Sequence, residues 1–198
     1  FSPDGKRIVF TRSGTFEFRE PDYAGGKKKI YDLFVCYLDS AAKGNTMFWH
    51  RVTDELGGRD PEWSADGTTI LFTKDINANV VKAFMPNYQI CTIDPEGGSF
   101  QMLRKDWQSM DEFFLAASMS PTGDIAFEHL YGKSTAENPE KKNFRPQRIA
   151  IRPRAAFTKS LDSVRAMSSK FTDYRAPSWS PDGQWLAVVK SDMSKSGV

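Results

Sequence analysis

Short apolar runs separated by polar turns recur along the chain. Four copies of one five-residue pattern, a large apolar residue followed by Ser, Pro or Ala, Asp or Thr, and Gly, begin at Phe1, Trp63, Met119 and Trp179. In this pattern proline presets φ, the Asp side chain bonds the local backbone, and glycine adopts the positive φ of a tight turn. An apolar run such as residues 70–72 follows each turn, so every copy predicts a β-hairpin.

A second apolar element recurs downstream of each hairpin. Residues 32–39 resemble residues 88–94, and residues 147–152 form a weaker third copy. A fourth short run follows, for example at 51–53 or 101–103, so each unit predicts four strands. A β-sandwich with repeated hairpins is the alternative, but regular four-strand units with the same turn favour radial repetition.

The predicted fold class is therefore all-β, a β-propeller built of four-stranded antiparallel blades. We expect one partial propeller domain over residues 1–198, with repeat turns at 2–5, 64–67, 120–123 and 180–183. The repeats account for about three blades plus a hairpin, whereas closed rings contain roughly four to eight blades. We expect the remaining blades of a six- to eight-bladed ring to come from the same or another polypeptide.

Two segments carry a family resemblance. The string at 88–98, Tyr-Gln-Ile-Cys-Thr-Ile-Asp-Pro-Glu-Gly-Gly, and the turn segment at 176–183 resemble the TolB-like, or PD40 (WD40-like), propeller repeat. The resemblance covers nearly the whole chain apart from its long connections. It implies the propeller fold but not one function, because such repeats occur in periplasmic TolB and in the propellers of prolyl-oligopeptidase-type proteases.

The overall charge and hydropathy restrict the partners. The 27 basic and 25 acidic residues give a net charge of +2, which gives no reason to expect a nucleic-acid partner. No stretch approaches the ~20 apolar residues of a membrane-spanning helix. Resemblance to TolB favours a periplasmic or cell-envelope location, and a cytoplasmic one stays open.

The two cysteines occupy equivalent positions in successive repeats. Aligning Asp39 with Asp94 aligns Cys36 with Cys91. Neighbouring sheets pack about 10 Å apart, whereas a disulfide needs Cα atoms within about 7 Å. We therefore expect two free thiols that pack between blades as small hydrophobic side chains.

Motifs for catalysis are missing from the sequence. There is no Gly-x-Ser-x-Gly, no phosphate-binding loop and no dinucleotide fingerprint, and His50 and His129 lack metalloprotease spacing. The turn role of Asp4, Asp66 and Asp182 already explains these carboxylates. We therefore predict no catalytic residue, no metal site and no cofactor in this chain.

Long connections between the second and third strands are the candidate binding elements. They span about 13–30, 75–87 and 131–146, and equivalent connections of a propeller share one end of the ring. Loops on a rigid scaffold often carry binding, and aromatic residues beside lysine and arginine suit a protein partner. The candidate partner-binding residues are Phe16, Phe18, Tyr23, Lys27, Lys28, Phe84, Lys141, Lys142 and Arg145. The alternative is a set of solvated loops with no partner.

The sequence thus favours a non-catalytic TolB-like scaffold for protein–protein or peptide binding. The alternative is the propeller segment of a prolyl-oligopeptidase-type peptidase whose catalytic domain lies outside this chain. A Gly-x-Ser-x-Gly segment with an α/β pattern elsewhere in the same polypeptide would favour the peptidase.

Overall fold

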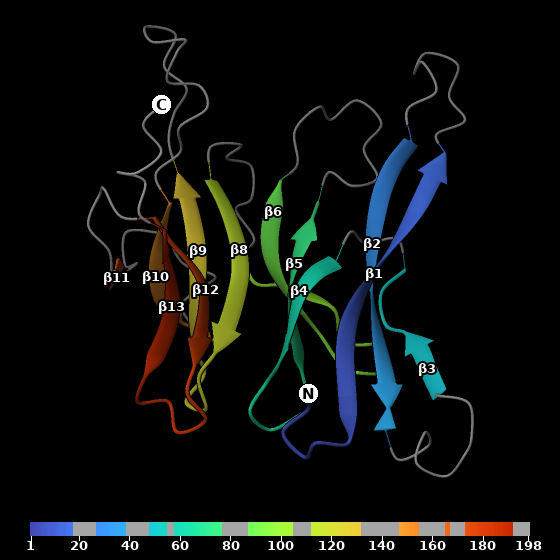
Figure 1. Cartoon of the computed structure of the whole chain (residues 1–198), viewed down its shortest axis with the longest axis horizontal. Coiled ribbons are helices and arrows are strands. Elements are labelled where there is room, and N and C mark those ends of the chain that lie inside the picture. Colours follow the sequence, from blue (N-terminus) through green and yellow to red (C-terminus); the bar gives the residue numbers. More distant parts are fainter. Residues whose placement is uncertain are drawn as a thin grey trace, which may run out of the picture.

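The computed structural model describes residues 1–17, 27–38, 48–54, 58–76, 87–104, 112–131, 147–154, 165–166 and 173–191. These residues form four antiparallel sheets arranged in a row (Figure 1). The first sheet contains β1 (Arg7–Glu17), β2 (Lys27–Tyr37) and β3 (Phe48–Arg51). The second contains β4 (Gly58–Trp63), β5 (Ile70–Asp75), β6 (Tyr88–Ile93) and β7 (Gln101–Met102). The third contains β8 (Glu112–Met119), β9 (Asp124–Tyr131), β10 (Gln147–Pro153) and β11 (Arg165–Ala166), and the last contains β12 (Asp173–Trp179) and β13 (Leu186–Ser191).

Sequence order within each sheet confirms the predicted blade. The second and third sheets each run through four consecutive antiparallel strands, and the repeated turn joins the first strand to the second. The first sheet starts at the second strand of a blade, and the last sheet is the opening hairpin of another. The fold is thus a β-propeller, and its described part comprises three blades, the first with three strands, and a hairpin.

The repeated turn is held by similar hydrogen bonds in each copy, with Thr122 in place of the aspartate and a turn one residue shorter in the third. In the second sheet the Ser64 amide donates to the Thr69 carbonyl at 2.8 Å, and the Gly67 amide donates to the Ser64 carbonyl at 2.9 Å. The Ser64 hydroxyl donates to the Asp66 carboxylate at 2.6 Å and accepts from the Thr69 amide at 3.0 Å. Gly67 has φ of +71°, which explains the glycine that ends each motif.

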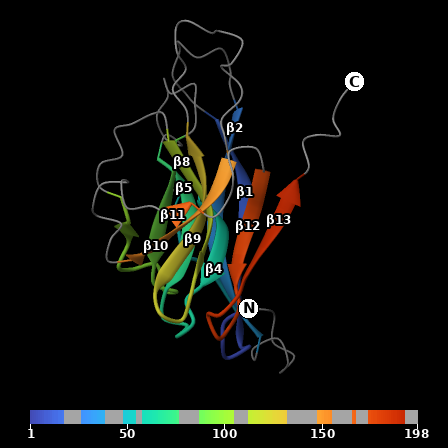
Figure 2. The ribbon, with the colours of Figure 1, turned by 90° about the vertical axis from the view of Figure 1, so that its left-hand side faces the viewer.

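The core lies between the sheets and not within one of them. Alternate residues of the second sheet point to opposite neighbours, so Ile70 and Phe72 pack against the first sheet, whereas Leu71 packs against the third. All three side chains have 0% exposure. Burying such side chains contributes about 1.5–3 kcal/mol each, so face-to-face packing of the sheets is the main source of stability. Figure 2 looks along the row from the side of β12 and β13 and shows the sheets one behind another.

The first strands of the second, third and last sheets, β4, β8 and β12, each carry a bulge at an equivalent position. Asp60, Ala116 and Ala176 have φ of 50°, 44° and 45°, and the register shifts at the same three places. Such backbone costs about 1–3 kcal/mol for a residue with a Cβ. The preceding sheet offsets this cost, because Thr73 Oγ1 accepts from the Ala116 amide at 3.0 Å and Glu128 Oε1 accepts from the Ala176 amide at 2.7 Å.

The first strands are also tied to one another laterally. The Ser118 hydroxyl donates to the Glu62 carboxylate at 2.7 Å and accepts from the Trp179 amide at 3.0 Å. Strand β4 contacts β1 and β8, and β8 contacts β12. These contacts fix the sheets at one relative orientation and thereby position their two ends.

One expected loop is partly strand. The pattern predicts a connection over about 13–30, but β1 and β2 pair from Arg7 with Tyr37 as far as Glu17 with Lys27. The alternation there is interrupted by Ser13 and Gly14, so the apolar pattern ends before the hydrogen-bonded ladder does. Phe16, Lys27 and Lys28 therefore lie on paired strands and not in a loop.

Candidate functional site

The two ends of the sheets differ in their connections. The repeated turns lie at the lower end in Figure 1, whereas β1 with β2, β5 with β6 and β9 with β10 connect at the upper end. We call this upper end the loop end. Strands β1, β5 and β9 all run toward this end in Figure 1, as expected for strands that precede equivalent connections. The candidate residues Phe18, Tyr23, Phe84, Lys141, Lys142 and Arg145 lie outside the described residues.

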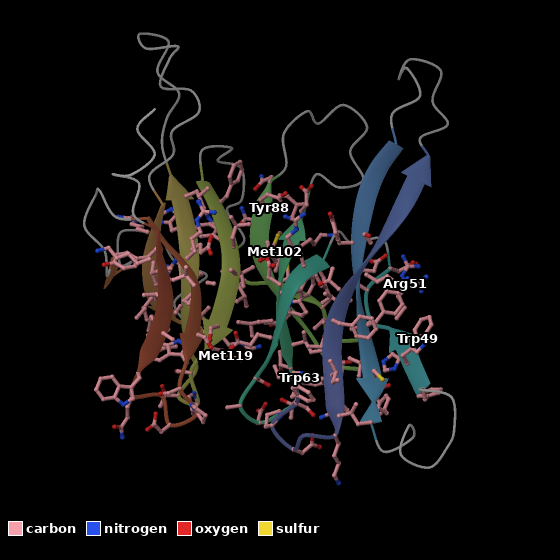
Figure 3. All side chains as sticks on the ribbon, in the orientation of Figure 1. Trp49, Arg51, Trp63, Tyr88, Met102 and Met119 are labelled. Carbon is pink, nitrogen blue, oxygen red and sulfur yellow. The ribbon has the colours of Figure 1, made fainter. Side chains whose placement is uncertain are left out.

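A cluster of aromatic rings around an arginine lies at the loop end. The guanidinium carbon of Arg59 is 4.9 Å from the ring centroid of Tyr31 and 5.0 Å from that of Tyr88. Tyr31 belongs to β2 of the first sheet, whereas Arg59 and Tyr88 belong to β4 and β6 of the second. Figure 3 labels Tyr88 near the upper end of the second sheet. We call Tyr31, Arg59 and Tyr88 the arginine–tyrosine cluster.

Gly58 brings the start of β4 close enough to form this cluster. A Cβ at this position would lie 3.1 Å from Leu33 Cγ and 3.2 Å from Phe72 Cδ2, so a larger residue would push β4 away from the first sheet. Gly58 is itself buried. The glycine thus places the neighbouring Arg59 between tyrosines of two sheets.

The cluster continues into the third sheet and lies beside the carboxyl group of Asp60. Tyr88 meets the ring of Phe113 on β8 edge to face, with the centroids 6.0 Å apart. Burial raises the pKa of Asp60, an effect that the nearby Arg59 charge and a hydrogen bond from Thr73 partly oppose. Burial also raises the pKa of Tyr88, so its hydroxyl stays protonated at neutral pH. The cluster therefore offers hydrogen-bond donors and aromatic surface, with one carboxyl group beside them.

The face of the first sheet that points away from the second sheet is a second candidate surface. Ile8, Phe10, Arg12, Phe34, Cys36 and Trp49 line a groove of about 360 Å³ there. We call it the end groove. Trp49 is 47% exposed, and Figure 3 shows it at the outer edge of the row. At the other end of the row, Trp185 is 73% and Val189 57% exposed.

The cysteines have the expected chemical state. Both are free and buried. Cys91 packs in the core between the first and second sheets, and burial raises the pKa of its thiol to about 12. The expected equivalence with Cys36 is wrong: Cys91 pairs with Phe72, whereas Cys36 pairs with Ile8 and lines the end groove, so Phe34 holds the place of Cys91 on the first sheet.

The two histidines have structural contacts. His50 Nε2 donates to the Pro95 carbonyl at 2.8 Å, which ties the first sheet to a turn of the second. His129 is 1% exposed and stacks on Phe114 with centroids 5.1 Å apart. Burial, and then the charges of Arg148 and Arg104, lower the pKa of His129 to about 3, so it stays neutral at physiological pH. Across the described ranges no three His, Cys, Asp or Glu residues cluster as metal ligands would, and no helix is long and apolar enough to cross a bilayer.

Sequence reasoning missed the arginine–tyrosine cluster. Its three members come from three different strands, whereas the sequence pattern points to the long connections between strands. One signal was available: Arg59 and Arg175 occupy the same position in their repeats, directly before the bulge residue. A repeated arginine at the start of the first strand points to the loop end of the sheets.

Comparisons with known proteins show the fold alone. No protein-family model and no curated protein matches the chain. A solved structure of hydrazine synthase from Kuenenia stuttgartiensis matches with 18% identity and a TM-score of 0.58, covering 93% of this chain and 24% of that one. The tricorn protease matches with 14% identity and a TM-score of 0.49, covering 91% and 14%.

A third structural neighbour is oligogalacturonate lyase from Vibrio parahaemolyticus. It matches with 12% identity and a TM-score of 0.49, covering 99% of this chain and 58% of the lyase. The tricorn protease and the lyase are β-propeller folds. The chain therefore spans less than two thirds of each of these three proteins.

Proposed function

We propose that the chain is a non-catalytic scaffold of the TolB-like kind that binds a protein or peptide at the loop end. The observation that carries this proposal is the arginine–tyrosine cluster, which joins two sheets below the long connections. Tyrosine and arginine are the residue types enriched in protein interfaces, and loops on a rigid scaffold are the usual carriers of binding. The TolB-like repeat supports a periplasmic or envelope location as part of the same proposal.

We further propose that other propeller blades cover the two end sheets. The end groove is lined by Ile8, Phe10 and Phe34, at the positions that Ile70, Phe72 and Cys91 hold in the second sheet. There the equivalent face is fully covered by the sheet before it. When apolar faces of this kind are left uncovered, they associate with other protein surfaces.

A loop replacement tests the binding proposal. Residues 18–26 are replaced by Asn-Gly, which closes a two-residue hairpin between the paired residues Glu17 and Lys27 and keeps the β1–β2 register. The partner is isolated with the unmodified chain, and its binding to both forms is measured by calorimetry. The matched control is Thr122→Ala, an exposed change in a turn at the opposite end.

Binding should weaken at least tenfold in the loop replacement and stay unchanged in the control. Unchanged binding in both forms contradicts a role for the first connection. The peptidase alternative is tested separately, because it requires a Gly-x-Ser-x-Gly segment elsewhere in the same polypeptide.

A further inference from the structure

Arg59 is held in an arrangement that leaves one direction for binding. The rings of Tyr31 and Tyr88 each lie about 5 Å from its guanidinium carbon, at 4.9 and 5.0 Å. Aromatic rings attract a guanidinium through its flat faces, whereas its N–H donors point outward in its own plane. A guanidinium that meets rings through its faces keeps its in-plane N–H donors for a further group.

The described carboxylates near Arg59 accept hydrogen bonds from other groups, although the Arg59 charge also acts on Asp60. Asp60 accepts a hydrogen bond from Thr73, and Asp75 accepts the Asn87 amide at 3.0 Å. Within the described ranges no carboxylate lies within ion-pair distance of the Arg59 guanidinium. By contrast, Arg51 pairs with both Asp32 and Asp54. The arginine at the loop end is thus positioned by aromatic rings, and its in-plane donors have no acidic partner among these residues.

The charge of the loop-end segments indicates which partner suits such an arginine. Basic residues outnumber acidic ones in 77–86 and 132–146; the segment 18–26 has one basic and two acidic residues, but three lysines follow it at 27–29, where β2 begins. The three segments join strands that end at the loop end. An acidic partner is attracted to such an end, and complementary charge speeds association and excludes basic competitors.

We propose that Arg59 binds a carboxylate of an acidic peptide segment through its in-plane N–H donors. A carboxylate matches the guanidinium fork with two parallel hydrogen bonds, and the flanking tyrosines hold that fork in place before the ligand arrives. The inference rests on the proposed binding function and specifies the chemistry of the partner. The carboxylate is either an Asp or Glu side chain or a peptide C-terminus, and the experiment separates the two.

The test uses three capped peptides and the NMR signals of arginine Nε–H groups in the whole chain. The first peptide is acetyl-Gly-Ser-Glu-Glu-Ser-Gly-amide, the second replaces both Glu by Gln, and the third is the Gln peptide with a free C-terminal carboxylate. Arg59→Lys identifies the Arg59 signal by its disappearance. Arg12→Lys is the matched control, because Arg12 also lies over an aromatic ring, that of Trp49 at 5.8 Å, but in the end groove.

The Glu peptide should shift the Arg59 signal, while the neutral Gln peptide should not. If only the free C-terminus produces the shift, the carboxylate comes from the chain end. The Arg59→Lys variant should bind the active peptide at least tenfold more weakly, because an ammonium group lacks the planar fork, and Arg12→Lys should bind it unchanged. Thermal unfolding of each variant shows whether weaker binding comes from a loss of folding. The peptide titrations of the wild-type chain do not depend on the stability of any variant.

Two results overturn the proposal. One is an Arg59 signal that neither carboxylate peptide moves, and the other is an Arg59 shift that the capped Gln peptide, which carries no carboxylate, produces as strongly as the carboxylate peptides do. Either result leaves the scaffold function standing if the loop replacement at 18–26 still abolishes partner binding. Failure of both experiments removes the binding function as well.

Discussion

Gly97 lies in the turn between β6 and β7, where the second sheet comes closest to the first. Its φ is +91°, and a Cβ built on it would lie 2.8 Å from the carbonyl oxygen of Val52. Val52 is buried, and its amide donates to the Leu33 carbonyl at 2.8 Å, so the carbonyl has no easy way to retreat. The substitution Gly97→Ala should therefore impose both backbone strain and a steric conflict between two sheets.

Gly123 separates these two effects. Its φ is +90°, almost equal to that of Gly97, but a Cβ there meets no atom within 4 Å. Gly123→Ala should cost only the backbone strain, about 1–3 kcal/mol. Gly97→Ala should cost a further 1–3 kcal/mol, roughly the cost of overpacking a well-packed site.

Urea unfolding followed by circular dichroism measures both variants against the wild-type chain. The account predicts that Gly97→Ala lowers the free energy of unfolding by at least about 1 kcal/mol more than Gly123→Ala does, at equal m-value. Equal losses for the two variants would refute the close approach of the β6–β7 turn to the first sheet. They would also refute the packing of the first two sheets as blades.

Three further predictions concern titratable groups. Iodoacetamide at pH 8 should alkylate Cys36 in the end groove before Cys91, whose pKa is raised to about 12, and equal rates in the native chain would contradict this packing. Burial raises the pKa of Glu62, so the folded chain loses stability as pH rises and the carboxyl group ionises. Because glutamine resembles the protonated, uncharged form, Glu62→Gln should be tolerated at pH 7. Glu62→Ala should instead cost about 1–3 kcal/mol by leaving the Ser118 hydroxyl without its acceptor, and equal urea midpoints for the two variants would count against this. Hydrogen bonds from Ser64 and Thr68 lower the pKa of Asp66, so the stability that its carboxylate contributes is present above its ordinary pKa of 3.8 and is lost as pH falls through the lowered pKa. The destabilisation by Asp66→Ala should therefore fade in thermal melts at increasingly acidic pH, and a pH-independent loss would contradict this.

Much of the fold follows from the sequence because the turns that separate its strands are specified by residues within the turns themselves. The Ser-Pro-Asp-Gly turn specifies its own hydrogen bonds, as Ser64 and Asp66 illustrate, so hairpins and repeat boundaries can be read directly. The uninterrupted apolar run Ile70, Leu71 and Phe72 likewise predicts a strand whose two faces are both buried, because successive side chains point to opposite faces. Local chemistry therefore predicts the blade.

What the sequence did not predict depends on contacts between blades. The positive φ of Ala116 has no glycine or asparagine to announce it, and it exists because Thr73 of the preceding sheet accepts the exposed amide. The extension of β1 to Glu17 likewise comes from pairing with β2 and not from an apolar pattern. Arg59 meets Tyr31 only when two sheets are packed, so the cluster has no signature in any one segment.

The most direct test of the account compares the two ends of one sheet by site-specific photocrosslinking. A benzophenone amino acid is placed either at Lys141, between β9 and β10 at the loop end, or at Thr122, in the exposed turn between β8 and β9 at the opposite end. Each form is irradiated in the presence of the isolated partner. The account predicts a covalent adduct from position 141 and none from position 122. An adduct from position 122 alone would contradict binding at the loop end.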